Sequence, residues 1–379
     1  MSHQPADPPT EAPAEGLYEY SVVYTDRALN HMSPAFQGVM KELSAILKEA
    51  YRARSAIVVP GSGTFGMEAV ARQFATGRKC LVIRNGFFSY RWSQIFEMGR
   101  IPAECSVLKA RSVSANLMSP FLPPPLEEVV QAIRSQKPDL VFAPHVETAS
   151  GIILPDRYLQ AVAEATHAAG GMFVLDCVAS GAMWVDMGAC GVDILLSAPQ
   201  KGWSAPPCGA FVMLSEQARE RIESTTSTSF AADLRKWLQI METYEGGGHA
   251  YHATLPTNAL AAAVEAMRET RDWGFDKARE AQARLGTLVR GLLEARGGFS
   301  VAAPGYQAPS VVVSYTSDPQ VQSGSKFAEQ GVQIAAGVPL MCDEPSYFST
   351  FRIGLFGLDK LQNVERTVER LNKALRKIR

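Results

Sequence analysis

The sequence lacks the features that mark a membrane-spanning or nucleic-acid-binding protein. No stretch reaches the roughly 18 uncharged apolar residues that a membrane-spanning helix needs. Lys and Arg together number 37 against 38 Asp and Glu, so the net charge is -1 and there is no basic excess. We therefore expect a soluble protein with no nucleic-acid and no membrane partner.

Cysteine is scarce, and no two cysteines form a C-x-x-C pair. Like reduced thiols of cytosolic proteins, they lie in or beside apolar runs. The six are Cys80, Cys105, Cys177, Cys190, Cys208 and Cys342. The first 16 residues are acidic and Pro-rich and lack the basic and apolar regions of a targeting peptide. These absences predict a cytoplasmic protein whose residues 1–16 form a disordered arm.

The residues that are present indicate an ordinary folded protein. Hydrophobic residues make up 46% and charged residues 20% of 379 residues, which allows a large core without disulfides. Short apolar runs alternate with helical patterns, which predicts an α/β fold with a mostly parallel sheet covered by helices on both faces. The stretch 208–214 follows Lys201 after too few residues for a crossover helix, so we expect that strand to run antiparallel to its neighbour.

The pattern also divides the chain. Ser33 is placed to cap a first helix that has Pro34 at its first position. Near the other end, a long helical segment over 258–295 is followed by strand-like stretches and by an apolar stripe that predicts one helix over 361–378, capped by Asp359. The strand-like stretches are 310–316, 332–335 and 351–354. We expect three parts: the arm at 1–16, a large domain at 17–257 and a smaller C-terminal α/β domain at 258–379.

A glycine-rich turn follows the first apolar run. It reads Val59-Pro60-Gly61-Ser62-Gly63-Thr64 and precedes an amphipathic helix. Glycines let backbone amides approach a ligand, and the N-terminus of a helix favours an anion such as phosphate. The Gly-Lys-Ser/Thr of a Walker loop is missing. An ordinary turn with a helix cap is the alternative.

Three charged residues lie at the ends of, or inside, other apolar runs, where doubly wound sheets bind ligands. Asp176 ends one run, and a buried carboxylate there needs a cation or several donors, although a helix cap would also explain it. Lys201 follows the next run; shielding from water would make its amine a usable nucleophile, whereas a solvated loop lysine is the alternative. The planar fork of Arg352 suits a carboxylate, either of a substrate or of an internal acidic residue.

In their order along the chain these residues resemble the fold-type I enzymes that use pyridoxal 5'-phosphate. Longer strings are similar to the class V aminotransferases of the alanine-glyoxylate and serine-glyoxylate type. The strings are Ser62-Gly63-Thr64, Asn85-Gly86-Phe87-Phe88, Glu147-Thr148-Ala149-Ser150-Gly151, Asp176-Cys177-Val178-Ala179-Ser180, Gln200-Lys201-Gly202, Tyr251-His252-Ala253-Thr254-Leu255-Pro256 and Phe351-Arg352-Ile353-Gly354. The resemblance implies a seven-stranded type of sheet and extends from about residue 55 to the C-terminus.

The resemblance implies transamination between a small amino acid, such as alanine or serine, and glyoxylate or pyruvate by a ping-pong mechanism. Lys201 is implied to hold the cofactor covalently and then to move a proton from the substrate Cα, and Asp176 to pair with the pyridine nitrogen. The remaining cofactor contacts are implied to come from Phe88 at the ring face, Thr148 at the ring oxygen, and Ser62, Gly63, Thr64 and Gln200 at the phosphate, with Val178 as a further cofactor contact. Core packing for Phe88 and a turn for Thr148 are the simpler alternatives.

A homodimer with shared active sites is also implied. Tyr251 and Thr254 would reach the phosphate in the neighbouring subunit, and Arg352 would clamp the substrate carboxylate and so orient the Cα–H bond.

One motif of the family is absent. A Gly-Pro-Gly-Pro-like segment usually lines the substrate pocket, and the matching region here lacks it. Tyr24, Arg27 or His31 would then line the pocket instead. The stretch 310–352 is somewhat similar to the 2-aminoethylphosphonate-pyruvate transaminases, although Gln200 favours the glyoxylate group.

Other functions fit less well. A cysteine desulfurase or lyase of the same fold would need a mobile group, for which Cys342 is the candidate, but its acidic surroundings disfavour a thiolate. A cofactor-binding regulator would need a basic DNA-binding segment, and none precedes the fold. His249 and His252 lie three apart without a third ligand, so no metal is expected.

Overall fold

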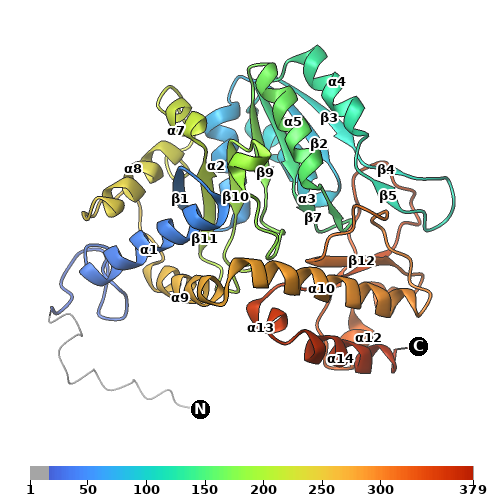
Figure 1. Ribbon diagram of the computed structural model, residues 1–379. Coiled ribbons are helices and arrows are strands. Elements are labelled where there is room, and N and C mark those ends of the chain that lie inside the picture. Colours follow the sequence, from blue (N-terminus) through green and yellow to red (C-terminus); the bar gives the residue numbers. More distant parts are fainter. Residues whose placement is uncertain (1–16, 379) are drawn as a thin grey trace.

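A seven-stranded mixed sheet forms the centre of the computed structural model, which describes residues 17–378 (Figure 1). The strand order is β1 (Ser55–Pro60), β11 (Gly209–Leu214), β10 (Ile194–Ser197), β9 (Met172–Asp176), β6 (Leu140–Pro144), β2 (Lys79–Arg84) and β3 (Glu104–Lys109). The strands from β10 to β3 run parallel, and β11 is antiparallel to both β1 and β10. The predictions of a mostly parallel sheet and of one antiparallel strand at 208–214 are confirmed.

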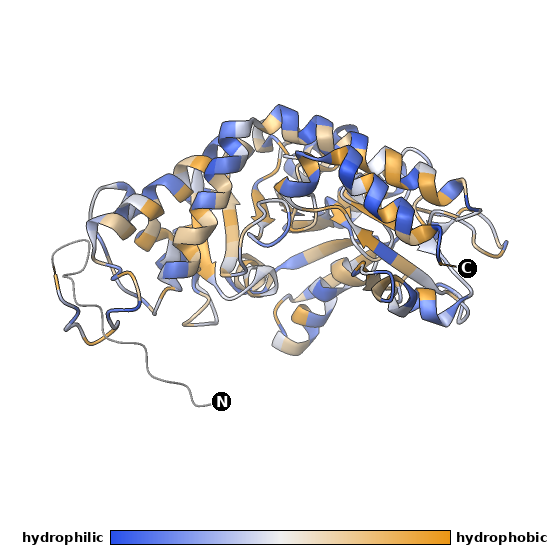
Figure 2. Ribbon diagram, turned by 90° about the horizontal axis from the view of Figure 1, so that it is seen from below, coloured by the Kyte–Doolittle hydropathy of each residue, from blue (hydrophilic) through white to orange (hydrophobic). Residues whose placement is uncertain are grey.

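Helices cover both faces of this sheet (Figure 1). The helices that accompany it are α1 (Pro34–Tyr51), α2 (Gly63–Val70) with a π-helical extension (Ala71–Ala75), α3 (Phe87–Gly99), α4 (Leu126–Gln136), α5 (Asp156–Ala168), α6 (Met187–Cys190), α7 (Glu216–Ile222) and α8 (Leu234–Glu245). Short strand pairs lie beside it: β4 (Arg111–Ser112) with β5 (Phe121–Leu122), and β7 (Val146–Glu147) with β8 (Ile152–Ile153). The central strands are buried along their whole length, which is why their sequences are continuously apolar (Figure 2).

The first helix begins as its sequence predicts. The hydroxyl of Ser33 accepts a hydrogen bond from the Phe36 amide at 3.2 Å, and Pro34 occupies the first turn. The helix ends at Tyr51, and the following residue, Arg52, caps it with a left-handed backbone (φ 54°). No described helix is long and apolar enough to cross a membrane. The predicted arm at 1–16 lies outside the described residues.

A three-stranded antiparallel sheet forms the C-terminal part. Its order is β12 (Val311–Tyr315), β14 (Thr350–Gly354), β13 (Ala335–Ala336). The accompanying helices are α9 (Thr257–Trp273), α10 (Phe275–Glu294), α11 (Pro319–Gln322), α12 (Ser325–Ala328), α13 (Leu358–Leu361) and α14 (Val364–Leu375). The strands expected at 310–316 and 351–354 are thus present, and that at 332–335 contributes only its last residue. The domain boundary at residue 257 stays a prediction.

Of the two helical predictions in this part, the first is confirmed with a break inside it and the second was wrong. The segment 258–295 is two helices, because Gly274 between them has φ 109°, a backbone region that favours glycine. The single helix expected over 361–378 is also two: α13 contains Asp359, and α14 starts only at Val364 after a break. Asp359 therefore lies inside a short helix and caps nothing.

The long helix α10 packs against β12 of the small sheet, and Figure 1 shows it running below the large sheet. Its buried Gln282 donates to the carbonyls of Pro309 at 3.1 Å and Leu355 at 3.2 Å. Ser310, just before β12, donates to the carbonyl of Ala179 at 2.8 Å. These bonds fix the small sheet, and β14 within it, against the loop that follows β9.

Candidate active site

One pocket brings together most of the site residues expected from the sequence. It lies where β1, β6, β9 and β10 end and where α2 begins. The expected residues that line it are Ser62, Gly63, Thr64, Phe88, Thr148, Asp176, Val178, Gln200 and Lys201, and they are joined by Met67, Arg91, Pro144, Val146 and Ala179. We call this set the Lys201 pocket.

The pocket owes its central acid to the end of β9. Asp176 is paired in register with Pro144 of β6 and Leu196 of β10, so both neighbouring strands fix its backbone. Its Oδ1 accepts a hydrogen bond from the Val178 amide at 2.9 Å. Burial raises the pKa of Asp176 to about 6, although the Val178 amide and the charge of Lys201 act in the opposite direction.

Burial acts on Lys201 in the complementary way. It lowers the pKa of the lysine, an effect opposed by Asp176 and Glu147 and reinforced by Arg91 and Arg352. A lysine with a lowered pKa carries more of the unprotonated amine, which is the nucleophilic form. The pocket can therefore present an amine and, across from it, a carboxyl group.

Phe88 is the aromatic surface of this pocket. Lys201 Nζ lies 5.8 Å from its ring centroid, and the guanidinium carbons of Arg91 and Arg352 lie at 4.7 and 5.4 Å. Phe356 from the loop after β14 adds a second ring 5.7 Å from Lys201 Nζ. The amine thus lies within cation–π distance of two aromatic rings.

The position of Phe88 depends on Glu147, to which the sequence assigned no role. The buried Glu147 carboxylate accepts hydrogen bonds from the amides of Phe88 at 3.2 Å and Ser89 at 2.9 Å, and from the Ser89 hydroxyl at 2.7 Å. It therefore caps the N-terminus of α3 from another part of the chain. A Cβ at Gly86 would lie 2.6 Å from Glu147 Cγ, which explains the glycine in Asn85-Gly86-Phe87-Phe88.

Glu147 could have been found from its position shortly after the apolar run 140–143, since a carboxylate buried at the end of a strand needs several donors. The neighbouring His145 was also missed. Its Nδ1 lies 2.7 Å from the Ser180 hydroxyl, and burial lowers its pKa to about 3, so the ring is neutral at physiological pH. This contact fastens the loop after Asp176 to the end of β6.

The glycine-rich turn forms one end of the pocket. Ser62 is the N-cap residue of α2, and a Cβ at Gly63 would lie 3.0 Å from Val178 Cγ2, so only glycine fits without displacing that wall. Thr64 accepts a hydrogen bond from Arg91 Nη1 at 3.1 Å. Backbone amides and hydroxyls at a helix N-terminus make this end suitable for an anion.

Arg352 lies on β14, beside the pocket. Its Nε donates to the Ala336 carbonyl on the neighbouring strand at 2.8 Å, which holds the guanidinium over Phe88. Burial lowers the pKa of Arg352, and Glu147 opposes this. Among residues 17–378 Arg352 forms no ion pair with an acidic side chain, so the internal ion pair considered from the sequence is not formed, and the role of substrate ligand stays a prediction.

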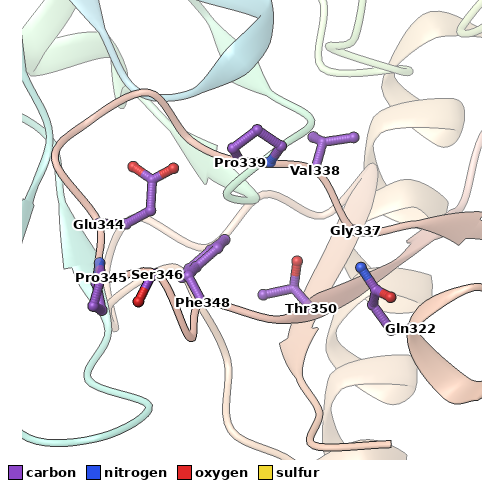
Figure 3. Close-up of a pocket in the computed structure, with 9 residues that line it drawn as sticks. All are labelled: Gln322, Gly337, Val338, Pro339, Glu344, Pro345, Ser346, Phe348 and Thr350. Carbon is purple, nitrogen blue, oxygen red and sulfur yellow. The ribbon is translucent and has the colours of Figure 1, made fainter. Parts of the chain in front are cut away.

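A second cavity lies between the loop after β13 and the start of β14 (Figure 3). Gln322, Gly337, Phe348 and Thr350 line it, and the Glu344 carboxylate accepts from the amides of Leu340, Met341 and Cys342, at 2.6, 3.1 and 2.8 Å. A Cβ at Gly337 would overlap the Thr350 carbonyl. Gly337 therefore lets the loop pass close to β14. It directly follows Ala336, whose carbonyl orients Arg352.

Tyr251 and Thr254 do not line the Lys201 pocket. They contact each other at 3.1 Å between their hydroxyl oxygens, and Tyr251 is 53% exposed. Tyr251 lies 5.5 Å from the ring of His31, and Tyr24 donates to the Leu255 carbonyl at 3.2 Å. The segment 17–31, which reaches this region through Tyr24 and His31, carries four large exposed side chains: Leu17, Tyr18, Tyr20 and Val22. We call this region the Tyr251 surface.

The two histidines considered as metal ligands contact different partners. His249 meets the ring of His31 at 6.0 Å, and His252 Nε2 lies 2.9 Å from the Phe230 carbonyl. Among residues 17–378 no group of three or more potential ligands gathers.

Comparison with known proteins adds independent information. The aminotransferase class-V family model matches residues 9–366. Alanine-glyoxylate aminotransferase of Rattus norvegicus is 28% identical over 373 residues, covering 92% of this chain and 82% of that protein. 2-Aminoethylphosphonate-pyruvate transaminase of Vibrio vulnificus is 27% identical over 330 residues, covering 85% of this chain and 83% of that protein.

Solved structures agree with the family match. Aspartate aminotransferase of Thermus thermophilus superposes with a TM-score of 0.76 at 25% identity, covering 93% of both chains. Alanine-glyoxylate aminotransferase of Nostoc sp. has a TM-score of 0.78 at 23% identity and covers 93% of this chain and 89% of that one. The predicted α/β fold of fold type I is therefore confirmed.

Proposed function

The chain belongs to the class-V aminotransferases, and from this premise we propose that it transfers an amino group from a small amino acid to a small 2-oxo acid. Alanine or serine would be the donor and glyoxylate or pyruvate the acceptor. Pyridoxal 5'-phosphate would be the cofactor, and the substrates would enter in turn, as a ping-pong mechanism requires. The observation that carries the proposal is the meeting of Lys201, Asp176 and the Ser62–Thr64 turn in one pocket.

The residues of the pocket fit this cofactor. The turn offers hydroxyl and amide donors for a phosphate, and the absence of a Cβ at Gly63 leaves room beside Val178. Phe88 provides a ring surface, and the Asp176 carboxyl suits a protonated pyridine nitrogen. When bound, pyridoxal 5'-phosphate would withdraw electrons from the substrate Cα and carry the amino group between the two substrates.

Lys201 would act first as a nucleophile and then as a base. Its lowered pKa favours the unprotonated amine that bonds to an aldehyde. The same nitrogen, when free and unprotonated, would be the base that takes the proton from the substrate Cα. Asp176, ionised above about pH 6, would keep a proton on the ring nitrogen opposite, and Thr148 would bond the ring oxygen.

Arg352 would hold the substrate carboxylate. Its Nε is used by Ala336, which leaves the two terminal nitrogens to pair with two carboxylate oxygens. Such a pairing fixes the rotation of the substrate and so directs its Cα–H bond toward Lys201.

We propose that the protein works as a homodimer in which Tyr251 and Thr254 complete the neighbouring pocket. Support comes from their position outside their own pocket and from the exposed apolar side chains of the Tyr251 surface, such as Tyr20 at 92% and Val22 at 102% exposure. The free thiols of all six cysteines support a reducing compartment such as the cytoplasm.

A second candidate function is 2-aminoethylphosphonate-pyruvate transamination, which the relative from Vibrio vulnificus favours. The donor of that reaction carries a phosphonate where an amino acid carries a carboxylate, so Arg352 would bind a phosphonate group instead. Desulfurase activity is less well supported. Cys342 is buried with its Sγ 3.4 Å from the Arg84 carbonyl, and burial raises its pKa to about 12, which disfavours a reactive thiolate.

A half-reaction screen tests the proposal. Holoenzyme would be mixed with one donor at a time (alanine, serine, aspartate or 2-aminoethylphosphonate), and the loss of the aldehyde absorbance of the cofactor followed without an acceptor. We expect alanine or serine to react, and glyoxylate or pyruvate to restore the spectrum. Reaction with 2-aminoethylphosphonate alone would establish the second candidate instead. Sulfide released from cysteine would favour the desulfurase.

A further inference from the structure

Arg91 is a charged residue of the Lys201 pocket to which neither the sequence patterns nor the proposed mechanism gives a role. It lies on α3, three residues after Phe88, and lines the pocket together with the Ser62–Thr64 turn. Its Nη1 donates to Thr64 Oγ1 at 3.1 Å, and its guanidinium carbon lies 4.7 Å from the Phe88 ring centroid. Both partners are neutral, and within residues 17–378 no carboxylate forms a direct ion pair with Arg91, although its charge acts on Asp176 in the same pocket.

The proposed phosphate end is otherwise made of neutral groups. A phosphate ester carries about -1.5 to -2 charges at pH 7. Ser62, Gly63, Thr64 and Gln200 can offer hydroxyl, amide and backbone N–H donors, but none of them carries a charge. Of the described residues that line the pocket, only Arg91 and Lys201 are cations, and the proposed function commits Lys201 to the aldehyde of the cofactor.

Two contacts hold the guanidinium at this end. The stack on Phe88 restricts one face, and the bond to Thr64 directs one terminal nitrogen at the turn itself. An arginine held in this way offers several fixed donors to an oxyanion. Burial is the largest cause of the lowered pKa of Lys201, and the charge of Arg91 acts in the same direction.

We propose that Arg91 supplies the positive charge of the phosphate site, pairing with a phosphate oxygen beside Thr64. The inference rests on the proposed function, because it assumes a phosphorylated pyridoxal cofactor. Arg91 would thus add one charged ligand, from the same subunit, to the neutral donors of the phosphate site. In this role Arg91 recognises the phosphate of the cofactor and not its ring.

Two forms of vitamin B6 that bind without a covalent bond distinguish recognition of the phosphate from recognition of the ring. Pyridoxamine 5'-phosphate and pyridoxamine share the ring and differ in the phosphate. Their dissociation constants would be measured by fluorescence on cofactor-free wild type, Arg91→Gln, Arg91→Lys and, as a charge-matched control on the exposed end of the same helix, Arg100→Gln. Competition by inorganic phosphate would be measured on the same proteins, and thermal melting would verify folding.

We expect Arg91→Gln to weaken pyridoxamine 5'-phosphate binding about 10- to 100-fold, the loss of a charged hydrogen bond, with pyridoxamine binding unchanged. Arg91→Lys should recover part of the loss, and Arg100→Gln should match wild type. Inorganic phosphate should compete with the phosphorylated vitamer in wild type and compete more weakly in Arg91→Gln.

An equal loss for both vitamers would overturn the inference, because Arg91 would then only hold Phe88 in place. Unchanged binding of the phosphorylated vitamer in Arg91→Gln would overturn it as well. If Arg91→Gln does not fold, the comparison of Arg91→Lys with wild type and the phosphate competition decide the question. Failure of wild type to prefer the phosphorylated vitamer would count against the proposed cofactor itself and so against the proposed function.

Discussion

The Lys201 pocket and the Tyr251 surface contribute to one proposed site but are built differently. Asp176 is fixed by two neighbouring strands, Lys201 follows a buried strand, and Ser62 begins a helix, so the pocket is set by the sheet. Tyr251 and Thr254 lie on an irregular, exposed segment and contact mainly each other. Under the proposed function, the groups that carry the chemistry therefore come from one subunit, and Tyr251 and Thr254 of a second copy would complete the site by binding the phosphate of the cofactor.

The largest expected effect comes from removing the amine. Lys201→Ala should lower kcat by about 1,000-fold or more, because both the nucleophile and the base are lost. Steady-state transamination measures this, with Lys109→Ala as control, since Lys109 forms an exposed ion pair with Asp343 away from the pocket. Normal turnover in Lys201→Ala would refute the role of the pocket.

Asp176→Asn should separate function from stability. Transamination should fall by about 100-fold or more, because the neutral amide no longer holds a proton on the ring nitrogen. The cofactor-free protein should become more stable above pH 6. Burial raises the carboxyl pKa from 3.8 to about 6, so Asp176 favours the fold when protonated, and that contribution is lost as the pH rises through about 6.

The gain in the free energy of unfolding should be up to about 3 kcal/mol at pH 8 and should vanish near pH 4. Urea unfolding of cofactor-free wild type and Asp176→Asn at the two pH values measures it. A variant that is less stable than wild type at pH 8 would contradict the burial argument, whatever its activity.

The sequence predicted the residues that line the pocket better than the residues that hold them in place. Asp176, Lys201 and Ser62 each follow an apolar run, and in an α/β fold the ends of such runs meet at one edge of the sheet. Glu147 and Arg91 were missed because their roles depend on contacts between α3 and distant segments, and no local pattern records those. The break at Gly274 was missed for a related reason: apolar spacing continues through it, and only the backbone angle shows the end of the helix.

Arg352→Ala should affect substrate binding more than the cofactor. We expect KM for both the amino acid and the oxo acid to rise about 10- to 100-fold, since a charged pair to the carboxylate is lost, while affinity for pyridoxamine 5'-phosphate stays the same. The KM values of Arg352→Lys should lie between those of wild type and Arg352→Ala, because lysine keeps the positive charge but cannot pair with two carboxylate oxygens at once. An unchanged KM would mean that Arg352 does not bind the substrate carboxylate and has only a structural role.

The smallest expected effect sharpens the comparison directly. Tyr251→Phe should weaken pyridoxamine 5'-phosphate binding by about 2- to 10-fold, the loss of one hydrogen bond, with kcat nearly unchanged at saturating cofactor. Tyr20→Phe on the same surface serves as the control. A protein that stays monomeric in sedimentation at assay concentrations, or a Tyr251→Phe variant with unaltered affinity, would remove the second subunit from the site.

The central claim is that the amine of Lys201 bonds covalently to the cofactor. Borohydride reduction of the holoenzyme followed by peptide mass spectrometry tests it most directly. We predict a reduced phosphopyridoxyl group on Lys201, and its absence from Lys201→Ala treated in the same way. A label on another lysine, or no label in a protein that still transaminates, would contradict it.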